Sequence, residues 1–240
     1  MSNHKTMNGL IALVGAGEYL PVMEEVDSYL LSSVSPTVPR VVCLPTAAGQ
    51  EGDDVVNRWS RMGIEHFQKL GAEVLALNII DKESANDPKF DTPLENADII
   101  YFSGGNPMHL YQTMQGSRAW TAIQKAWSRG AVYAGCSAGA MILAKKVPSF
   151  RLAQTVEGFG IVPATFVIPH FDATPFFFKP LVFALRKQLK KGERMLGVDE
   201  NTALVGSLGG EWKVLGHGTV HLITLESDDA YKPGEIVPLQ

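Results

Sequence analysis

The sequence predicts an α/β fold, a flavodoxin-like three-layer α/β/α domain with a mostly parallel sheet and antiparallel C-terminal hairpins. Short, continuous apolar segments that end in glycine or proline alternate with longer segments of helical spacing. This alternation is typical of parallel strands with helices on both faces. Short β segments separated by turn residues follow near the C-terminus, and we expect them to form hairpins on the same sheet. No linker interrupts the pattern, so residues 1–240 are predicted to be a single domain.

The first half of the chain supplies three predicted strands and one helix. Residues 9–14 form an apolar run that ends in Gly15-Ala16-Gly17, as a buried parallel strand and its turn would. A second strand at 41–44 stops at Pro45, and a third is expected at 73–77. Between them, apolar residues at helical spacing predict a helix over 53–70, which Gly71 closes.

The second half continues the alternation and then changes character after Pro163. A strand at 97–102 runs into Ser103-Gly104-Gly105-Asn106-Pro107, and Gly130 stops a helix at 120–129. A strand at 131–134 leads to a predicted helix over 138–145, and residues 165–168 form a further strand-like run. A helix at 180–191 is followed by short β segments near 196–198, 202–206, 211–215 and 221–225.

Composition excludes several classes of function. A formal net charge of −4, with 21 Lys and Arg against 25 Asp and Glu, gives no electrostatic footprint for nucleic acid. No signal peptide is expected, and no apolar segment approaches the ~18 residues of a membrane span. The two cysteines, Cys43 and Cys136, lack metal-ligand spacing and fit a reducing compartment, so we expect a cytoplasmic protein. No metal and no organic cofactor is implied.

The strongest local signal is Gly135-Cys136-Ser137-Ala138-Gly139, between a predicted strand and a predicted helix. A nucleophile elbow needs this context, because the strand-to-helix turn exposes the serine Oγ and the flanking glycines relieve crowding. The amide of Ala138, at the helix start, would face a developing oxyanion. An ordinary turn is the alternative interpretation.

A second donor is expected from a neighbouring strand end. Gly104-Gly105-Asn106 follows the strand at 97–102, at the carboxyl edge of the sheet where ligands bind in such folds. Two glycines would let backbone amides approach a substrate closely, although a tight turn without a ligand explains them too.

Serine needs a base, and His170 is the favoured candidate among six histidines. It ends the strand-like run at 165–168 and precedes Phe171-Asp172, at an edge expected to meet Ser137. A structural core histidine is the competing interpretation. His66 is expected to be structural, and a surface role is expected for His109.

These residues resemble the dipeptidase E and cyanophycinase family of serine peptidases, which share the class I glutamine amidotransferase-like fold. The resemblance runs from about Gly9 to Leu225. It rests on four segments in the family's order, at residues 102–106, 135–139, 158–171 and 197–204. By resemblance, Ser137 is the nucleophile, His170 the base, and Gly105 with Ala138 the oxyanion amides. Related amidotransferases carry cysteine at the position of Ser137, so Cys136 is one residue early and should point into the core.

The chain departs from the family pattern in two places. The acid that orients the histidine usually follows the elbow helix, where this chain has Lys145 to Arg151 without a carboxylate. Asp172 is favoured instead, because residues i and i+2 of a strand share a face and related amidotransferases use such a pair. Glu157, or no acid at all, remains the alternative. Secondly, acid-specific members carry arginines after the histidine, where this chain has Phe176-Phe177-Phe178, so specificity for acidic side chains is not expected.

The sequence therefore predicts a serine peptidase or amidohydrolase of small peptides. Its predicted catalytic residues are Ser137, His170 and Asp172, and its predicted substrate-binding residues are Gly104, Gly105, Asn106 and Ala138. The expected partner is a small peptide substrate, with neither nucleic acid nor membrane, and a homodimer is compatible with this prediction. A catalytically silent binding module is the alternative from another class. A glutamine amidase is less favoured because serine stands in place of cysteine.

Overall fold

The computed structural model describes residues 9–149, 154–173 and 179–239. Its centre is an eight-stranded sheet with the order β14-β11-β10-β1-β5-β4-β2-β3. Five neighbouring strands are parallel to one another: β1 (Ile11–Val14), β5 (Val132–Cys136), β4 (Ile99–Phe102), β2 (Arg40–Leu44) and β3 (Glu73–Ala76). Three antiparallel strands extend it beyond β1: β10 (Thr202–Gly206), β11 (Trp212–Gly216) and β14 (Ile236–Val237).

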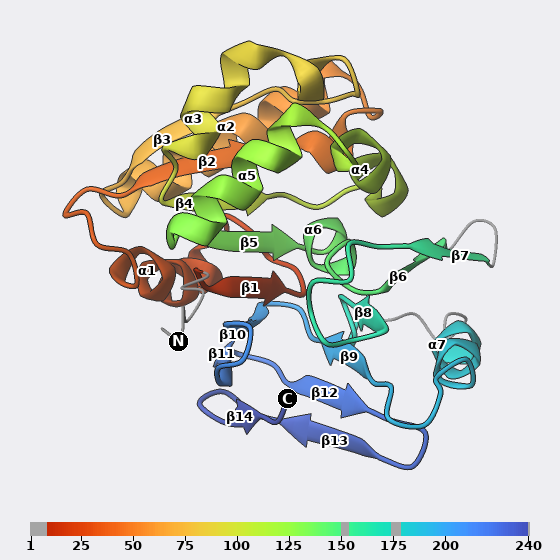
Figure 1. Cartoon of the computed structure of the whole chain (residues 1–240). Helices are drawn as coiled ribbons and strands as arrows, with labels where there is room; N and C mark the ends of the chain where they lie inside the picture. The colour runs from red at the N-terminus through yellow and green to blue at the C-terminus, as the bar shows by residue number, and fades with distance from the viewer. Residues whose placement is uncertain (1–8, 150–153, 174–178, 240) are drawn as a thin grey trace, which may run out of the picture.

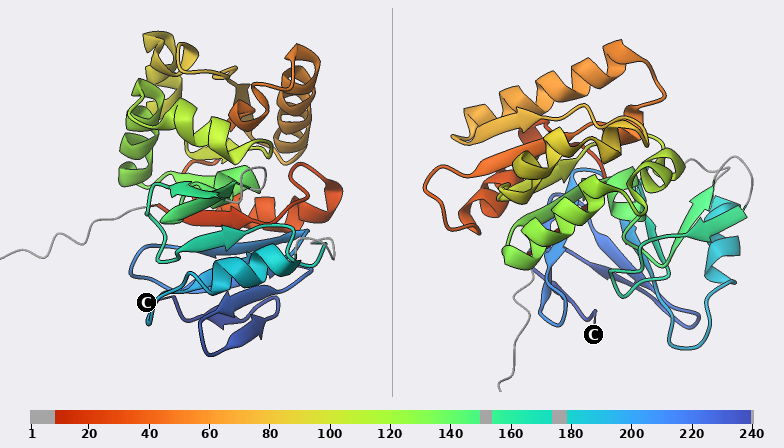
Figure 2. Two further views of the ribbon diagram at one scale, coloured as in Figure 1. Left: turned by 90° about the vertical axis from the view of Figure 1, so that its right-hand side faces the viewer. Right: turned by 45° about the horizontal axis from the view of Figure 1, so that its top comes forward.

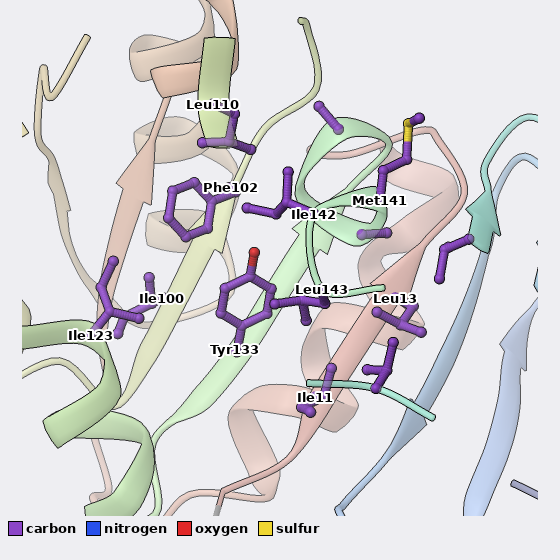
Figure 3. Close-up of a cluster of buried hydrophobic side chains, with 14 of the residues drawn as sticks. Ile11, Leu13, Ile100, Phe102, Leu110, Ile123, Tyr133, Met141, Ile142 and Leu143 are labelled. Atoms are coloured by element: carbon purple, nitrogen blue, oxygen red, sulfur yellow. The ribbon is translucent and has the colours of Figure 1, made fainter. Parts of the chain in front are cut away.

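Helices cover both faces of this sheet, so the predicted three-layer α/β fold is confirmed (Figures 1 and 2). One face is covered by α1 (Glu24–Ser32) and α2 (Asp53–Lys69), whose buried side chains pack on the alternate strand residues Ala12, Val14, Val41 and Cys43. The other face is covered by α3 (Asp91–Glu95), α4 (Pro107–Met114), α5 (Arg118–Arg129) and α6 (Ala138–Met141). Figure 3 shows this second core, with Tyr133 of β5 lying among Ile100, Phe102 and Leu143.

A second, four-stranded sheet lies below the parallel strands of the first in Figure 1. Its strand order is β13-β12-β9-β8, made of β13 (Asp228–Tyr231), β12 (Val220–Ile223), β9 (Met195–Val198) and β8 (Phe166–Ile168). Helix α7 (Lys179–Arg186) packs on it through Leu185, which contributes to a separate small core. The expectation that all C-terminal hairpins extend one sheet is therefore wrong. The chain leaves the small sheet after β9, because the β10 backbone pairs with β1 instead.

The predicted helix over 138–145 is also too long, since α6 ends at Met141. The residues that follow bond to a distant segment instead of continuing the helix. The Ile142, Leu143 and Ala144 carbonyls accept amides of residues 159–162, and the Lys145 amide donates to the Ala164 carbonyl. Tertiary hydrogen bonds thus override a local sequence that favours helix. This segment then enters a two-stranded ribbon of β6 (Lys146–Ser149) and β7 (Gln154–Glu157).

Short 3-10 turns complete the described fold. They are η1 (Pro21–Met23), η2 (Thr46–Ala48), η3 (Ser84–Asn86) and η4 (Pro88–Phe90). The turn η2 follows β2 at the carboxyl edge of the sheet, where its Ala47 carbonyl accepts the Asn106 amide. No helix of the described chain has the length and apolar character that crossing a membrane requires.

Candidate active site

Ser137 lies at the turn between strand β5 and helix α6. Its backbone has φ 48° and ψ −103°, a conformation that is strained for a residue with a side chain. The flanking glycines explain how the turn can be so tight. A Cβ at Gly135 would lie 2.4 Å from the Gly139 carbonyl carbon, and one at Gly139 would lie 2.9 Å from the Cβ of Phe102. The strand and the helix therefore approach each other at a distance that only glycine permits.

His170 faces Ser137 from the small sheet. Its Nε2 lies 3.2 Å from Ser137 Oγ, within hydrogen-bond distance. The residue follows β8 in the left-handed region, with φ 50°. Phe171 holds it there, because its amide donates to the Val198 carbonyl and its ring occupies the space where a Cβ at Gly197 would lie. The structure thus brings together the two residues that the sequence places at the centre of the site.

The carboxylate that contacts His170 in the structure belongs to Glu200. Its Oε1 lies 2.7 Å from His170 Nδ1, and the two side chains are 39% and 47% exposed. A carboxylate at Nδ1 holds a proton on that nitrogen, so that Nε2 is the nitrogen that can accept the proton of Ser137. Ser137, His170 and Glu200 thus form a continuous hydrogen-bonded chain with the geometry of a nucleophile, a base and an orienting acid.

Asp172, which the sequence favours as the acid, has a different contact. Its Oδ1 accepts the backbone amide of Glu200 at 2.8 Å, so it helps to hold the residue that contacts His170. The strand ends at Ile168, two residues before His170, and the rule that i and i+2 share a strand face does not apply there. The alternative, Glu157, ends β7 with an exposed side chain and pairs with Lys146 through its backbone.

Glu200 stands in the turn between β9 and β10, where the chain passes from the small sheet to the large one. The Asn201 amide donates to the Ala16 carbonyl at 3.1 Å, and the Thr202 hydroxyl donates to the Glu200 carbonyl at 2.9 Å. Buried Asp199 accepts the Thr219 amide at 2.8 Å. The segment containing this turn carries part of the family resemblance, but the sequence alone assigns Glu200 no role. A run of polar residues between two apolar strand segments was the available signal.

The loop after β4 lies beside Ser137. A Cβ built at Gly104 would lie 3.4 Å from the Cβ of Ser137, so the loop after β4 borders the serine directly. Within the described chain no acceptor is found for the amides of Gly105 and Ala138, the two predicted oxyanion donors. Gly105 has φ 143°, and a Cβ there would meet the Ala47 carbonyl at 2.6 Å.

Asn106, the third member of the predicted binding loop, serves mainly as a helix cap. Its Oδ1 accepts the Met108 amide at 3.0 Å and the His109 amide at 3.3 Å at the start of α4. Its side-chain nitrogen lies 3.4 Å from Gln50 Oε1, at the limit of a hydrogen bond. The side-chain oxygen therefore has partners within the protein, and a substrate contact of Asn106 stays a prediction.

The remaining sequence predictions concern residues around the site. Phe176, Phe177 and Phe178 lie outside the described residues. Cys136 is buried as predicted, and burial raises the pKa of its thiol well above the usual range. His66 is buried beside Asp27, 2.8 Å from its Oδ2, which agrees with a structural role. Among the residues that the structure describes, no group of three His, Cys, Asp or Glu could hold a metal ion.

Comparisons with known proteins agree on one family. The sequence model of peptidase family S51 matches residues 10–210. An uncharacterized peptidase of Bacillus subtilis (strain 168), YgaJ, is 27% identical over 69% of this chain and 70% of its own length. A cyanophycinase of Nostoc sp. is 25% identical over 67% of this chain, and the match spans 56% of the cyanophycinase.

Two solved structures share the fold. The crystal structure of a peptidase from an acI-B1 actinobacterium superposes with a TM-score of 0.86 at 35% identity, and the match covers 97% of each chain. A protein of Listeria monocytogenes described as a putative peptidase E superposes with a TM-score of 0.61 at 19% identity, over 94% of this chain and 98% of that one.

Proposed function

Because this chain belongs to peptidase family S51 and is a serine-type peptidase, we propose that it hydrolyses small peptides through Ser137, His170 and Glu200. The observation that carries the proposal is the hydrogen-bonded chain from Ser137 Oγ to His170 Nε2 and from His170 Nδ1 to Glu200 Oε1. Ser137 then stands on a nucleophile elbow, the turn that presents a serine Oγ at the edge of an α/β sheet.

In the acylation step, Ser137 Oγ attacks the carbonyl carbon of the scissile peptide bond while its proton passes to His170 Nε2. The imidazolium that forms is stabilised by the Glu200 carboxylate at Nδ1. The carbonyl oxygen becomes an oxyanion, which the amides of Gly105 and Ala138 are placed to bind. The tetrahedral intermediate collapses when the C–N bond breaks and His170 returns the proton to the leaving amine, which leaves an ester on Ser137.

Deacylation repeats these steps with water as the nucleophile. A water molecule transfers a proton to His170 Nε2 and attacks the ester carbonyl, and the same two amides bind the second oxyanion. Breaking the C–O bond returns the proton to Ser137 and releases the carboxylic acid product. The residues account for both halves of the reaction, with water as the only reagent besides the peptide.

For specificity, we propose that peptides with apolar or small residues are accepted at least as well as aspartyl dipeptides. Arg186 is the nearest described arginine after His170 in the sequence, and its guanidinium is used within the protein. Its Nε donates to the Thr224 carbonyl at 2.8 Å and its Nη2 to the Ser227 carbonyl at 3.0 Å. A kcat/KM about a hundredfold larger for aspartyl dipeptides than for apolar ones would contradict this part of the proposal.

The test is covalent labelling together with hydrolysis of a dipeptide panel. A fluorophosphonate should add one phosphonyl group, and peptide mapping should place it on Ser137. Ser137→Ala should lose both labelling and hydrolysis while its circular dichroism spectrum stays unchanged. Hydrolysis by Ser137→Ala within about tenfold of the wild type would overturn the assignment, because loss of a catalytic nucleophile costs far more.

A catalytically silent binding module was the other hypothesis, and its support was the missing acid. The contact of Glu200 Oε1 with His170 Nδ1 supplies a carboxylate there, which supports the hydrolytic proposal over the silent form. We further propose a cytoplasmic location, which the two free, buried cysteines support. Fractionation of the source cells with an antibody to the chain tests the location independently of activity.

A further inference from the structure

Glu18 is a buried carboxylate close to the site that the proposed mechanism does not use. It follows β1 by four residues and is only 7% exposed. Burying a carboxylate is unfavourable unless hydrogen bonds compensate for its lost hydration. The partners of Glu18 therefore indicate what the side chain does. The next residue, Tyr19, has φ 63°, a conformation that is rare for a bulky side chain.

The two oxygens of Glu18 bind two different loops of the site. Oε1 accepts the Gly104 amide at 2.8 Å, and Oε2 accepts the Cys136 thiol at 2.9 Å. Gly104 directly precedes Gly105, and Cys136 directly precedes Ser137. One side chain therefore joins the ends of β1, β4 and β5 at the residues before an oxyanion donor and before the nucleophile.

The bond to Gly104 restricts the peptide that carries the Gly105 amide. On one side of Gly105, the Gly104 amide is held by Glu18, and on the other the Asn106 amide donates to the Ala47 carbonyl at 2.8 Å. Gly105 itself is exposed, and its amide has no acceptor within the described chain. The residues on both sides of Gly105 are thus fixed by hydrogen bonds, while the Gly105 amide has no acceptor in the described chain. This arrangement suits an amide that binds a substrate oxygen.

Glu18 is not placed to take part in the chemistry directly. Its two oxygens are engaged by Gly104 and Cys136, and His170 already has the carboxylate of Glu200 at Nδ1. A general acid or base must contact the reacting atoms, and the described contacts of Glu18 go to the backbone and to a buried thiol. Its effect would therefore be transmitted through the amide of Gly105.

We propose, on the basis of the proposed hydrolytic function, that Glu18 is a positioning residue that holds the Gly104-Gly105 loop against Ser137 and so preforms the oxyanion hole. Removing its carboxylate lets the loop relax, so the Gly105 amide no longer points at the developing oxyanion. The substrate still binds in the ground state, because the lost contact forms only in the transition state.

The test compares three variants of the full chain. Glu18→Met removes both acceptors at similar length, Glu18→Gln keeps an acceptor for the Gly104 amide, and Asp27→Asn alters another buried carboxylate that contacts α2 instead of the site. Glu18→Met should lower kcat by about 10²-fold with KM changed less than about threefold, as for loss of one oxyanion donor. Glu18→Gln should recover kcat to within about tenfold of the wild type, and Asp27→Asn should change neither constant by more than about threefold.

A spectroscopic signature separates positioning from a general loss of structure. In the wild type, the Gly104 amide proton should resonate downfield, because its acceptor is a carboxylate, and it should move upfield in Glu18→Gln. If Glu18→Met does not fold, the Gly104 chemical shift and the kcat, both measured in Glu18→Gln, still test the positioning role. An unchanged Gly104 resonance in Glu18→Gln would overturn the proposal.

The kinetic outcomes also separate this proposal from the proposed function. An active wild type that depends on Ser137, with Glu18→Met equal to it in kcat, would refute the positioning role alone. An equal loss of kcat in Asp27→Asn would likewise refute it, because any buried carboxylate would then have the same effect. A wild type that neither hydrolyses peptides nor reacts with a fluorophosphonate would refute the proposed function, whatever Glu18 does to the Gly104 resonance.

Discussion

At the scale of single residues, the contact between Glu200 and His170 sets which imidazole nitrogen carries the proton. Glu200→Gln keeps the size of the side chain but lets an amide donate to Nδ1, which favours the wrong tautomer. We expect kcat to fall by about 10⁴-fold, as for loss of the acid in well-studied triads. Asp172→Asn should cost only about tenfold, because Asp172 contacts the Glu200 backbone and leaves the tautomer unaffected. Steady-state kinetics on one dipeptide checks both values, and a larger loss in Asp172→Asn than in Glu200→Gln would contradict the assignment.

The two cysteines allow a prediction about chemical modification. Burial raises the pKa of Cys43 to about 12 and raises that of Cys136 well above its usual range. At pH 8, only about one Cys43 thiol in ten thousand would then be ionised, and thiols react as thiolates. We expect native protein to resist iodoacetamide at pH 8, whereas urea should expose both thiols to alkylation. Mass spectrometry counts the added groups, and rapid labelling of the native chain would show that the thiols are accessible.

The residues of the site differ in how far the sequence could predict them. Ser137 and His170 were predictable, because glycine spacing and a strand end mark them locally, and the structure places them 3.2 Å apart. Their catalytic roles remain part of the proposal. Glu200 was not predicted, because its approach to His170 depends on the packing of two sheets. Strand periodicity, on which the prediction for Asp172 rests, does not hold at His170, because His170 lies beyond the strand and adopts φ 50°. Asp172 contacts the Glu200 amide instead.

At the scale of elements, the packing of α6 against β4 depends on Gly139. Gly139→Ala would place a methyl group 2.9 Å from the Cβ of Phe102, a backbone-anchored atom that cannot rotate away. We expect a loss of unfolding free energy of about 1–3 kcal/mol and a lower kcat, as overpacking displaces the helix that carries the Ala138 amide. Urea unfolding and kinetics on the same sample measure both.

Gly116→Ala provides the matched control for this prediction. Gly116 has φ 64°, and a Cβ there would have no neighbour within 4 Å, so its substitution adds backbone strain without a steric clash. It should cost about 1 kcal/mol of stability and leave kcat unchanged. If the two variants had equal kcat, close packing at Gly139 would not matter for the site.

The elements themselves were largely predictable where the sequence pattern is local. The strands at β1, β2, β4 and β5 and the helices α2 and α5 lie within a few residues of their predicted bounds. The length of α6 was not predictable, because the carbonyls of residues 142–145 accept amides of residues 158–162 instead of continuing the helix. The division of the C-terminal strands between two sheets was missed for the same reason, since turn residues do not reveal which strand becomes the partner.

At the scale of the whole molecule, the site draws on both sheets. Ser137 stands at the end of a strand of the large sheet, His170 follows a strand of the small one, and Glu200 lies in the turn between them. The small sheet in turn depends on residues beyond the 10–210 region of the family match, because β12 pairs with β9 from Val220 to Ile223. The C-terminal strands are therefore part of what positions the site.

A truncated chain of residues 1–210 tests this dependence. It lacks β11 and β12, and with them the buried side chains of Trp212, Val214 and Val220. We expect it to be insoluble or inactive, because β9 and β10 would each lose a partner strand while apolar surface is exposed. A chain of residues 1–227, which keeps both strands, is the comparison and should retain more activity. An active 1–210 chain would show that the large sheet alone can organise the site.

The turn between β9 and β10 has three residues, and each has a separate backbone or side-chain anchor. An inserted or deleted residue in this turn would break some of these anchors and shift Glu200 relative to His170. Evolution of the family should therefore tolerate length variation elsewhere but not in this turn. In an alignment of active relatives, we expect the stretch from 197 to 204 to be free of gaps. A gap there would mark a lineage that has replaced its acid or abandoned hydrolysis.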